Sequence, residues 1–148
     1  MKRNKLEIKI WSDIQCPFCY IGKHKFEKSL ETFEYKDAVN VVWKSFQLNP
    51  QLITNTSTST VEYLAKHKRI SVDKAREMGN HVIDAGNSIG LTFDFDSAVV
   101  ANTNRAHQIL HLAKKYAVQN NLKEKLFEDH FSNGKNIDDL DYLVDVAR

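Results

Sequence analysis

The sequence predicts an α/β protein that begins with a strand–helix–strand unit and continues as a long helical region. Apolar and charged residues alternate over 6–11, and a β-branched, aromatic segment follows at 39–44, with a helical repeat between them. After the second strand, every apolar repeat that we find has the spacing of a helix. We therefore divide the chain into a βαβ part, residues 1–49, and an all-helical part, residues 50–148.

The composition is that of a folded globular protein rather than of a nucleic-acid or membrane protein. The chain has 148 residues, enough for one domain or for one domain with a large insertion. Its 21 basic and 19 acidic side chains nearly cancel, so charge indicates neither a nucleic acid nor an anionic membrane as a partner. We find no signal peptide and no apolar span, and we expect a cytoplasmic protein.

The first three elements follow from local signals. Leu6, Ile8 and Ile10 share one face of the first strand. Pro17 suits the first turn of the helix that follows, since no hydrogen bond needs its missing N–H there. We expect the second strand, 39–44, to be buried on both faces and parallel to the first, because right-handed crossovers connect such units.

The remaining elements are predicted as helices after a polar connection at 54–60. Ser59 and Glu62 have the spacing of a capping box that opens the first of these helices. The apolar repeats that follow are 72–83, closed by Gly90, then 106–117, then 122–131, stopped by Asn133-Gly134, and finally 137–147, with Asn136 as its N-cap.

The two cysteines, Cys16 and Cys19, lie between the first strand and the first helix. Cys16 would face the free N–H groups at the helix N-terminus, which stabilise a thiolate. Cys19, one turn later, would be more shielded and within reach of a disulfide. This arrangement predicts a redox pair in which Cys16 reacts with the substrate and Cys19 resolves the mixed disulfide. Lys23 or His24 would then assist the thiolate. Asp13 would oppose it if close by, unless it caps the helix or lies in solvent.

A zinc site is the alternative from another class. His107 and His111 have the i, i+4 spacing that places both imidazoles on one helix face, and they could join the cysteines. The two halves, however, lie about 90 residues apart, far more than in a zinc finger. Inert cysteines are the third interpretation. A strand that leads directly into C-P-x-C and a helix favours the redox interpretation, and we predict no metal site.

Four segments, in order along the chain, resemble one known family. Residues 10–23 resemble the start of the DsbA-like thioredoxin-fold oxidoreductases, in the FrnE-like branch related to 2-hydroxychromene-2-carboxylate isomerases and kappa-class glutathione transferases. Residues 46–50, 102–107 and 126–137 resemble later segments of that branch. The resemblance covers essentially all of the chain. It implies a thioredoxin-like βαβ unit with a large all-helical insertion domain.

The resemblance also implies a function and a set of site residues. Cys16 corresponds to the nucleophile and Cys19 to the resolving cysteine of a thiol–disulfide oxidoreductase or isomerase. Its substrates would be protein or small-molecule thiols and disulfides, and no metal or organic cofactor is needed. Glutathione stays open as a reductant or co-substrate, and a glutathione-dependent isomerase or transferase is the second enzyme hypothesis. The substrate or cleft candidates are Pro17, Phe18, Asn49, Asn102 and His107. For Asn102 and His107, a helix cap and a helix-surface histidine are the ordinary alternatives.

One departure from the family pattern affects the sheet. Thioredoxin folds add a cis-proline loop, two strands and a helix after the insertion, but the prolines here, Pro17 and Pro50, lie elsewhere. We therefore expect a C-terminally truncated chain in which these strands and this helix are absent. A two-stranded sheet has an exposed edge, which could pair with a second copy to form a dimer. A structural or chaperone-like module is then a further alternative.

Overall fold

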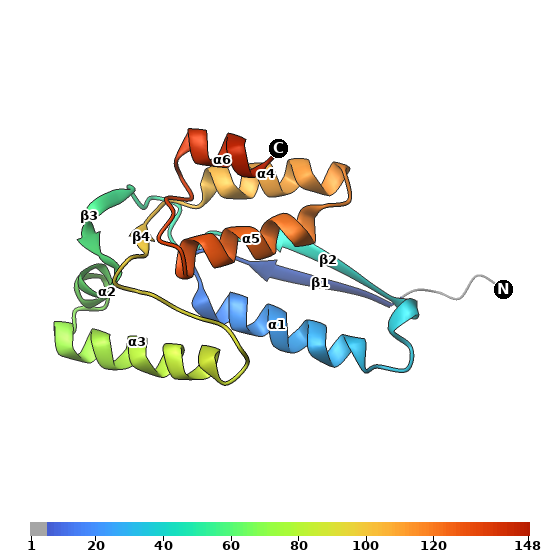
Figure 1. Ribbon diagram of the computed structural model, residues 1–148, viewed down its shortest axis with the longest axis horizontal. Helices are drawn as coiled ribbons and strands as arrows, with labels where there is room; N and C mark the ends of the chain where they lie inside the picture. Colours follow the sequence, from blue (N-terminus) through green and yellow to red (C-terminus); the bar gives the residue numbers. More distant parts are fainter. Residues whose placement is uncertain (1–5) are drawn as a thin grey trace.

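The chain begins with a parallel βαβ unit, as the sequence predicts. The computed structural model describes residues 6–148 (Figure 1). Strand β1 (Leu6–Ser12) leads into helix α1 (Pro17–Glu31), and a 3₁₀ turn (Lys36–Ala38) precedes strand β2 (Val39–Ser45). The two strands pair in parallel along their whole length, from Leu6 opposite Val39 to Ser12 opposite Ser45.

The second part of the chain contains a small sheet as well as helices. Its elements are β3 (Asn55–Ser59), α2 (Thr60–Lys68), α3 (Val72–Asn87), β4 (Val99–Val100), α4 (Asn104–Lys115), α5 (Gln119–Phe131) and α6 (Leu140–Val146). The mixed α/β class is thus confirmed. The expectation of a plain connection at 54–60 is wrong for residues 55–59, because this segment pairs antiparallel with β4. Its Thr and Ser side chains carry no apolar alternation that would mark a strand.

Helix boundaries follow the capping side chains. The capping box is confirmed, since the Ser59 hydroxyl accepts from the N–H of Glu62 and the Glu62 carboxylate accepts from the N–H of Ser59. The expected cap at Asn136 is wrong. Its side chain accepts from the N–H of Asp138 in a turn, and Asp139 caps α6 instead. The last helix therefore begins several residues later than its apolar pattern indicates.

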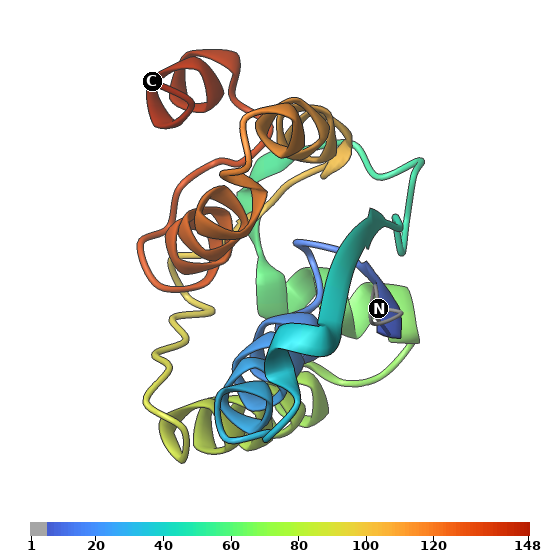
Figure 2. The same cartoon turned by 90° about the vertical axis from the view of Figure 1, so that its right-hand side faces the viewer.

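The main core joins both parts of the chain. In Figures 1 and 2, α1 and α3 lie below the β1–β2 pair, whereas α4, α5 and α6 lie above it. Tyr20 of α1 stacks on Phe127 of α5 with 4.9 Å between ring centroids. The most deeply buried members of this core are Ile14, Ala101, Ala106, Leu110, Leu126, Phe127, Ile137 and Leu143. Packing between α1 and the helical region consequently fixes what surrounds the start of α1.

Strand β2 is less buried than predicted. Only Trp43 is buried along it, and its other residues are half-buried or exposed. Within residues 6–148 the sheet has no third strand beside β2, so one edge of this strand is unpaired. A β-branched segment of this kind is typical of a strand that is paired on both edges and covered on both faces.

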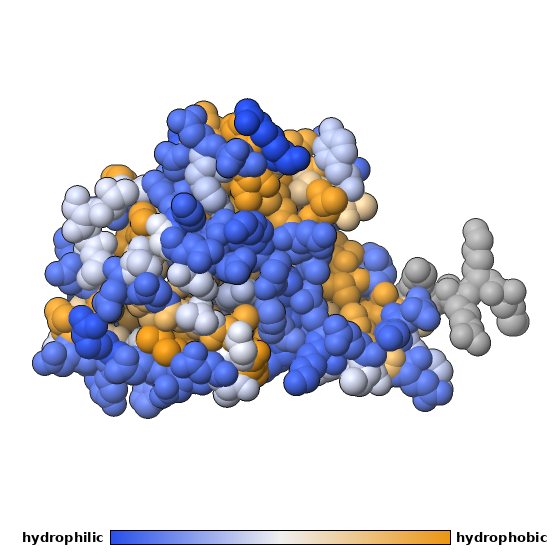
Figure 3. All heavy atoms as spheres, in the orientation of Figure 1, coloured by the Kyte–Doolittle hydropathy of each residue, from blue (hydrophilic) through white to orange (hydrophobic). Residues whose placement is uncertain are grey.

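The surface is mixed in character. Figure 3 shows a largely hydrophilic face interrupted by apolar areas. Several large apolar side chains are exposed, among them Phe18, Phe46, Leu48 and Ile53. None of the helices in the described part of the chain has the length and apolar character needed to cross a membrane.

Helix α3 packs closely against the loop that follows it at Gly86. A Cβ atom built at Gly86 would collide with the ring of Phe93, which is buried in the main core. We predict that Gly86→Ala lowers the free energy of unfolding by about 1–3 kcal/mol through overpacking. Urea denaturation measures the difference.

Gly22 provides the matched control for this substitution. It lies on the exposed face of α1, and nothing lies within 4 Å of the corresponding Cβ position. Gly22→Ala should therefore stabilise the protein by about 0.5–1 kcal/mol through helix propensity alone. Equal stability of the two variants would contradict the packing that we describe around Phe93.

Candidate active site

The two cysteines lie where β1 turns into α1. The N–H of Cys16 donates to the carbonyl of Asp13 at 3.2 Å, which closes a tight turn after the strand. Cys16 is the N-cap of α1 in an extended conformation, and Pro17 is the first helical residue, as predicted. Both cysteines are free thiols and half-buried. The N–H of Cys19 donates to the Cys16 carbonyl at 3.0 Å, so the helix begins directly between them.

The two thiols affect one another strongly. A hydrogen bond from the Cys16 thiol lowers the pKa of Cys19 to about 6, even though burial acts in the opposite direction. The same contact with Cys19, together with burial, raises the pKa of Cys16. The N–H groups of Cys19 and Phe18 do face Cys16 and favour its thiolate, as a helix N-terminus should. The pair therefore holds one proton between two sulfur atoms near neutral pH.

The expectation that Lys23 or His24 assists the Cys16 thiolate is wrong. Lys23 is buried, and its Nζ lies 2.9 Å from a carboxylate oxygen of Glu27 and 2.6 Å from one of Glu124. His24 also contacts Glu124, with 2.6 Å between Nε2 and Oε1. Both basic groups are thus engaged by carboxylates on α1 and α5 rather than by Cys16.

Asp13 is buried and neither caps α1 nor lies in solvent. One carboxylate oxygen accepts the N–H of Leu48 at 2.7 Å, and the other lies 3.1 Å from Nε2 of His107. Burial by itself would raise the pKa of Asp13, but the hydrogen bonds from His107, Leu48 and Thr103 outweigh burial and hold this pKa below its ordinary value. His107 is accordingly not a helix-surface histidine, because its contact with Asp13 brings it into the interior.

Polar side chains from four segments gather around this carboxylate. We call them the buried polar cluster: Ser12, Asp13, His107, Lys123 and His130, all at most 5% exposed. Burial lowers the pKa of His130 to about 4, so its imidazole is neutral at physiological pH. Burial also lowers the pKa of Lys123 to about 8, although the charges of Cys19 and Asp13 act in the opposite direction. The thiol pair therefore lies beside buried side chains, Lys123 and His130, whose own pKa values are shifted by burial.

Lys123 and His130 were not predicted from the sequence. Both occupy the same face of α5 as Leu126 and Phe127, and the i, i+3 and i+4 spacing shows this in the printed sequence. A polar residue at an apolar position of a helical repeat is the signal that could have identified them.

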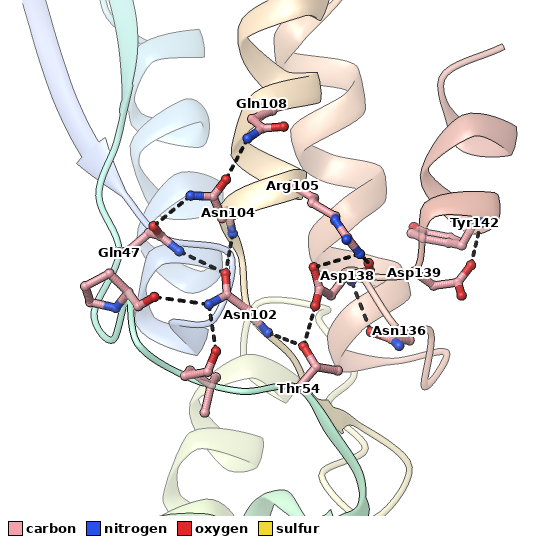
Figure 4. A network of polar contacts seen from close by, with 12 residues as sticks. Gln47, Thr54, Asn102, Asn104, Arg105, Gln108, Asn136, Asp138, Asp139 and Tyr142 are labelled. Atoms are coloured by element: carbon pink, nitrogen blue, oxygen red, sulfur yellow. Dashed lines mark hydrogen bonds and ion pairs between the residues drawn. The ribbon is translucent and has the colours of Figure 1, made fainter.

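Asn102 and Asn49 are two of the expected cleft residues, and the side chain of Asn102 donates to the loop after β2, whereas that of Asn49 donates to α2. The Asn102 amide donates to the carbonyls of Leu52 at 2.7 Å and Pro50 at 3.3 Å, while its backbone N–H donates to Thr54 (Figure 4). The Asn49 amide donates to the hydroxyl of Tyr63 at 3.2 Å. Of the five expected residues, Pro17, Phe18 and His107 lie beside the cysteines or Asp13, whereas these two asparagines connect the loop after β2 to its surroundings.

The same network reaches the turn before α6. Thr54, which accepts from Asn102, donates to a carboxylate oxygen of Asp138 at 2.6 Å. Arg105 donates to the Asp138 carbonyl at 2.9 Å (Figure 4). The loop after β2, the start of α4 and the segment before α6 are therefore held by one set of hydrogen bonds.

A family model and known proteins match this chain over nearly its whole length. The model of the DSBA-like thioredoxin domain matches residues 7–148. The chain belongs to this family. This DSBA-like chain is also 27% identical over 146 residues to the "Uncharacterized protein YwbO" of Bacillus subtilis (strain 168), with 96% of the chain and 64% of that protein covered.

A solved structure shows the same fold. The probable DsbA oxidoreductase SCO1869 from Streptomyces coelicolor superposes with a TM-score of 0.87 at 28% sequence identity. The match covers 95% of this chain and 61% of that one. The DSBA-like chain spans less than two thirds of the length of each of these two relatives. The expected thioredoxin-like fold is confirmed by the family match and by this superposition.

The described residues do not form the cluster of ligands that the zinc hypothesis requires. Within residues 6–148 no three His, Cys, Asp or Glu side chains gather as a metal site requires. His107 contacts Asp13, whereas Nε2 of His111 lies 2.9 Å from the hydroxyl of Ser45. The two histidines of the DSBA-like chain therefore have separate partners.

The Asp13 carboxylate should contribute strongly to stability. We predict that Asp13→Ala lowers the free energy of unfolding at pH 7 by about 2–4 kcal/mol, because it leaves the donors on Leu48 and His107 without their charged acceptor. Asp84, exposed on α3, is the matched control, and Asp84→Ala should change stability by less than about 0.5 kcal/mol. Urea denaturation compares the variants.

The effect of Asp13 should depend on pH. Its pKa in the folded protein lies below the ordinary value of 3.8, so its stabilisation is complete above that value and is lost as the pH falls through the folded pKa. The stability difference between wild type and Asp13→Ala should shrink from about pH 4 downward. A difference that stays constant to about pH 2 would contradict an ionised, hydrogen-bonded carboxylate.

Proposed function

We propose that the chain catalyses thiol–disulfide exchange through Cys16 and Cys19. The observation that supports this most strongly is the pair of free, half-buried thiols at the start of α1, where the contact with Cys16 lowers the pKa of Cys19 to about 6 and so favours a thiolate near neutral pH. Membership of the DSBA-like thioredoxin domain family and the likeness to a probable DsbA oxidoreductase support an oxidoreductase role.

The exchange takes place in two balanced steps. The shared proton moves from Cys16 to Cys19, and the Cys16 thiolate attacks one sulfur of a substrate disulfide. A Cys16–substrate disulfide forms, and the other substrate sulfur leaves as a thiolate that takes up a proton. Cys19 then loses its proton and attacks Cys16, which releases the second substrate thiol. The substrate disulfide is reduced by two electrons as the dithiol is oxidised, and the reverse sequence oxidises a substrate dithiol.

Proteins and small thiols are both candidate substrates. Phe18, inside the motif, is 64% exposed, and Leu48, whose N–H binds Asp13, is 57% exposed. Apolar side chains in these positions favour contact with an unfolded or flexible polypeptide beside the reacting disulfide. Glutathione, as a reductant or co-substrate, requires no further protein group for the exchange.

A redox titration tests the function. The protein is equilibrated in glutathione buffers of graded potential, free thiols are alkylated, and intact mass counts them. We expect a reversible two-electron transition that converts two free thiols into one internal disulfide. Thiols that stay reduced across the whole range would overturn the proposal.

Two single variants assign the roles in the same assay. Cys19→Ser should accumulate a stable mixed disulfide with glutathione at Cys16, because the resolving thiol is absent. Cys16→Ser should form neither the internal disulfide nor exchange products at a comparable rate. Turnover of a glutathione-dependent substrate that survives in Cys19→Ser would instead support the isomerase or transferase alternative.

The thiolate itself can be titrated by its ultraviolet absorbance. We predict that the first ionisation of the pair has a midpoint near pH 6, because the Cys16 thiol donates to the Cys19 thiolate. In Cys16→Ala this donor is absent, so the midpoint should rise by at least about one pH unit. An unchanged midpoint would show that the hydrogen bond between the thiols does not set the ionisation.

A further inference from the structure

The β1–β2 pair has two free edges, and a cavity runs beside one of them. Within residues 6–148 no further strand joins this sheet. A cavity of about 910 Å³ is lined by five consecutive residues of β2, Asn40–Lys44, and by Glu7 and Lys9 of β1. A continuous run along a single strand means that the cavity extends beside the unpaired edge of β2.

The backbone of this edge offers hydrogen bonds that no other segment uses. The N–H of Phe46, directly after β2, donates to the carbonyl of Ser12 in β1 at 3.2 Å. Every second residue of a strand directs its backbone groups to the same edge, so Val41 and Trp43 direct their N–H and C=O groups away from β1. Within residues 6–148 no other element bonds to these groups. Such an edge can accept a further strand.

The walls of the cavity are largely apolar. They include Val41 and Trp43 of β2, Phe26 and Leu30 from the second half of α1, and Ala117 from the turn between α4 and α5. In Figure 1 the second half of α1 and the turn between α4 and α5 lie toward the same end of the molecule, with the strand pair between them in this view. A strand added beside β2 would direct every second side chain into this space.

The charges in the lining of the cavity do not cancel. Its two acidic residues, Glu7 and Glu27, already form ion pairs with lysines, at 3.1 and 2.9 Å. Lys44 and Lys114 also line the cavity, and within residues 6–148 neither of them forms an ion pair. The lining therefore offers two unmatched positive charges, which favour an acidic partner.

The edge of β2 leads toward the cysteines. After β2 the chain continues to Leu48, whose N–H donates to the Asp13 carboxylate. The carbonyl of Asp13 in turn accepts from the N–H of Cys16. Phe46 and Leu48 are exposed along this path. A strand that covers the seven residues of β2 spans about 23 Å, so a polypeptide bound there continues toward the thiols.

We propose that the unpaired edge of β2 binds an extended segment of a polypeptide substrate. The segment adds as an antiparallel strand, the more stable of the two pairings, and places apolar side chains in the cavity. Its acidic side chains complement Lys44 and Lys114. This inference rests on the proposed thiol–disulfide exchange and names its substrate class: flexible polypeptides that carry a stretch of alternating apolar and acidic residues near the reacting cysteine.

A second copy of the chain suits this edge less well than a single segment. Paired through β2, it would bring its own α1 and its own turn between α4 and α5 to the same walls. It would also bring its own Lys44 and Lys114 to the same unmatched charges, and like charges repel. A single acidic segment brings neither obstacle.

Fluorescence anisotropy tests the binding with a labelled, cysteine-free peptide of about ten residues in which valine and glutamate alternate. We expect saturable binding to wild type below about 1 mM. In an antiparallel pair the valines that enter the cavity also direct their N–H groups toward β2. Methylation of the valine nitrogens should therefore weaken binding at least about tenfold.

Methylation of the glutamate nitrogens is the matched control, because these nitrogens face away from β2 and binding should persist. Equal binding of the two methylated peptides, stronger binding of the valine-methylated one, or no binding of the unmethylated peptide would overturn the inference.

The charge of the cavity is tested on the protein. Lys114→Glu should weaken binding of the same peptide at least about threefold, because repulsion replaces attraction. Lys115→Glu makes the same change of net charge at the next residue of α4, which is exposed and outside the cavity. It should weaken binding by less than about twofold. Equal effects of the two substitutions would contradict an acidic segment in the cavity.

Sedimentation velocity distinguishes a peptide from a second copy at this edge. We expect the 148-residue chain to sediment as a monomer. Val41→Pro removes an N–H that faces away from β1, a position at which edge strands tolerate proline. A dimer that this substitution dissociates would place a second copy on β2 and overturn the inference.

Competition connects the edge to the reaction. The cysteine-free peptide should raise the apparent KM for a disulfide-bonded peptide that carries the same alternating segment. It should leave the rate with oxidised glutathione unchanged, because glutathione has no such segment. An unchanged KM for the disulfide-bonded peptide would overturn the assignment of the edge to a substrate.

The redox titration separates the two proposals. If wild type forms the internal disulfide but does not bind the cysteine-free peptide, the inference fails and the proposed function stands. If the peptide binds through its valine N–H groups but no internal disulfide forms, the proposed function fails, and the assignment of the bound segment to a substrate fails with it.

Discussion

The buried carboxylate of Asp13 connects the parts of the molecule on which the site depends. It lies directly after β1, accepts the N–H of Leu48 from the loop after β2, and contacts His107 of α4, 94 residues away. A carboxylate that is 1% exposed would cost several kcal/mol without such partners. The bonds that offset this cost also fix the turn from which Cys16 and α1 start. The strand pair, the helical region and the thiols are thus held in one arrangement by one charge.

Local signals account for what the sequence predicts well. The alternation of residues 6–11, the proline after Cys16 and the capping box at Ser59 each act within a few residues, and the structure follows all three. The β3–β4 pair escapes prediction because it joins the polar segment Asn55–Ser59 to the two valines Val99 and Val100, at least 40 positions later, and no periodicity marks such a pairing. The late start of α6 escapes for a related reason, since Ile137 is buried in a turn and extends the apolar pattern beyond the helix.

The site shows the same division between local and tertiary effects. The position of the cysteines at a helix start follows from the neighbouring residues. The partners of Asp13 and the burial of Lys123 depend on how α4 and α5 pack against α1. From the sequence alone, a charged residue is expected to be exposed, because most charged residues in proteins are. Nearness in the chain predicts Lys23 and His24 as partners of Cys16, whereas Glu124 of a distant helix contacts both. Proximity in sequence therefore predicts the scaffold of the site better than its electrostatics.

The order of these elements along the chain has a consequence for biosynthesis. Lys123 follows the cysteines by about 100 residues, and a ribosome that adds about 5–20 residues per second takes roughly 5–20 seconds to reach it. Throughout this interval the buried polar cluster does not exist. The hydrogen bond between the two thiols and the N–H groups at the start of α1 are local to residues 13–19, so they can act on the thiols as soon as this helix start forms. The burial that the later helices add to the site comes only when α4 and α5 fold onto α1.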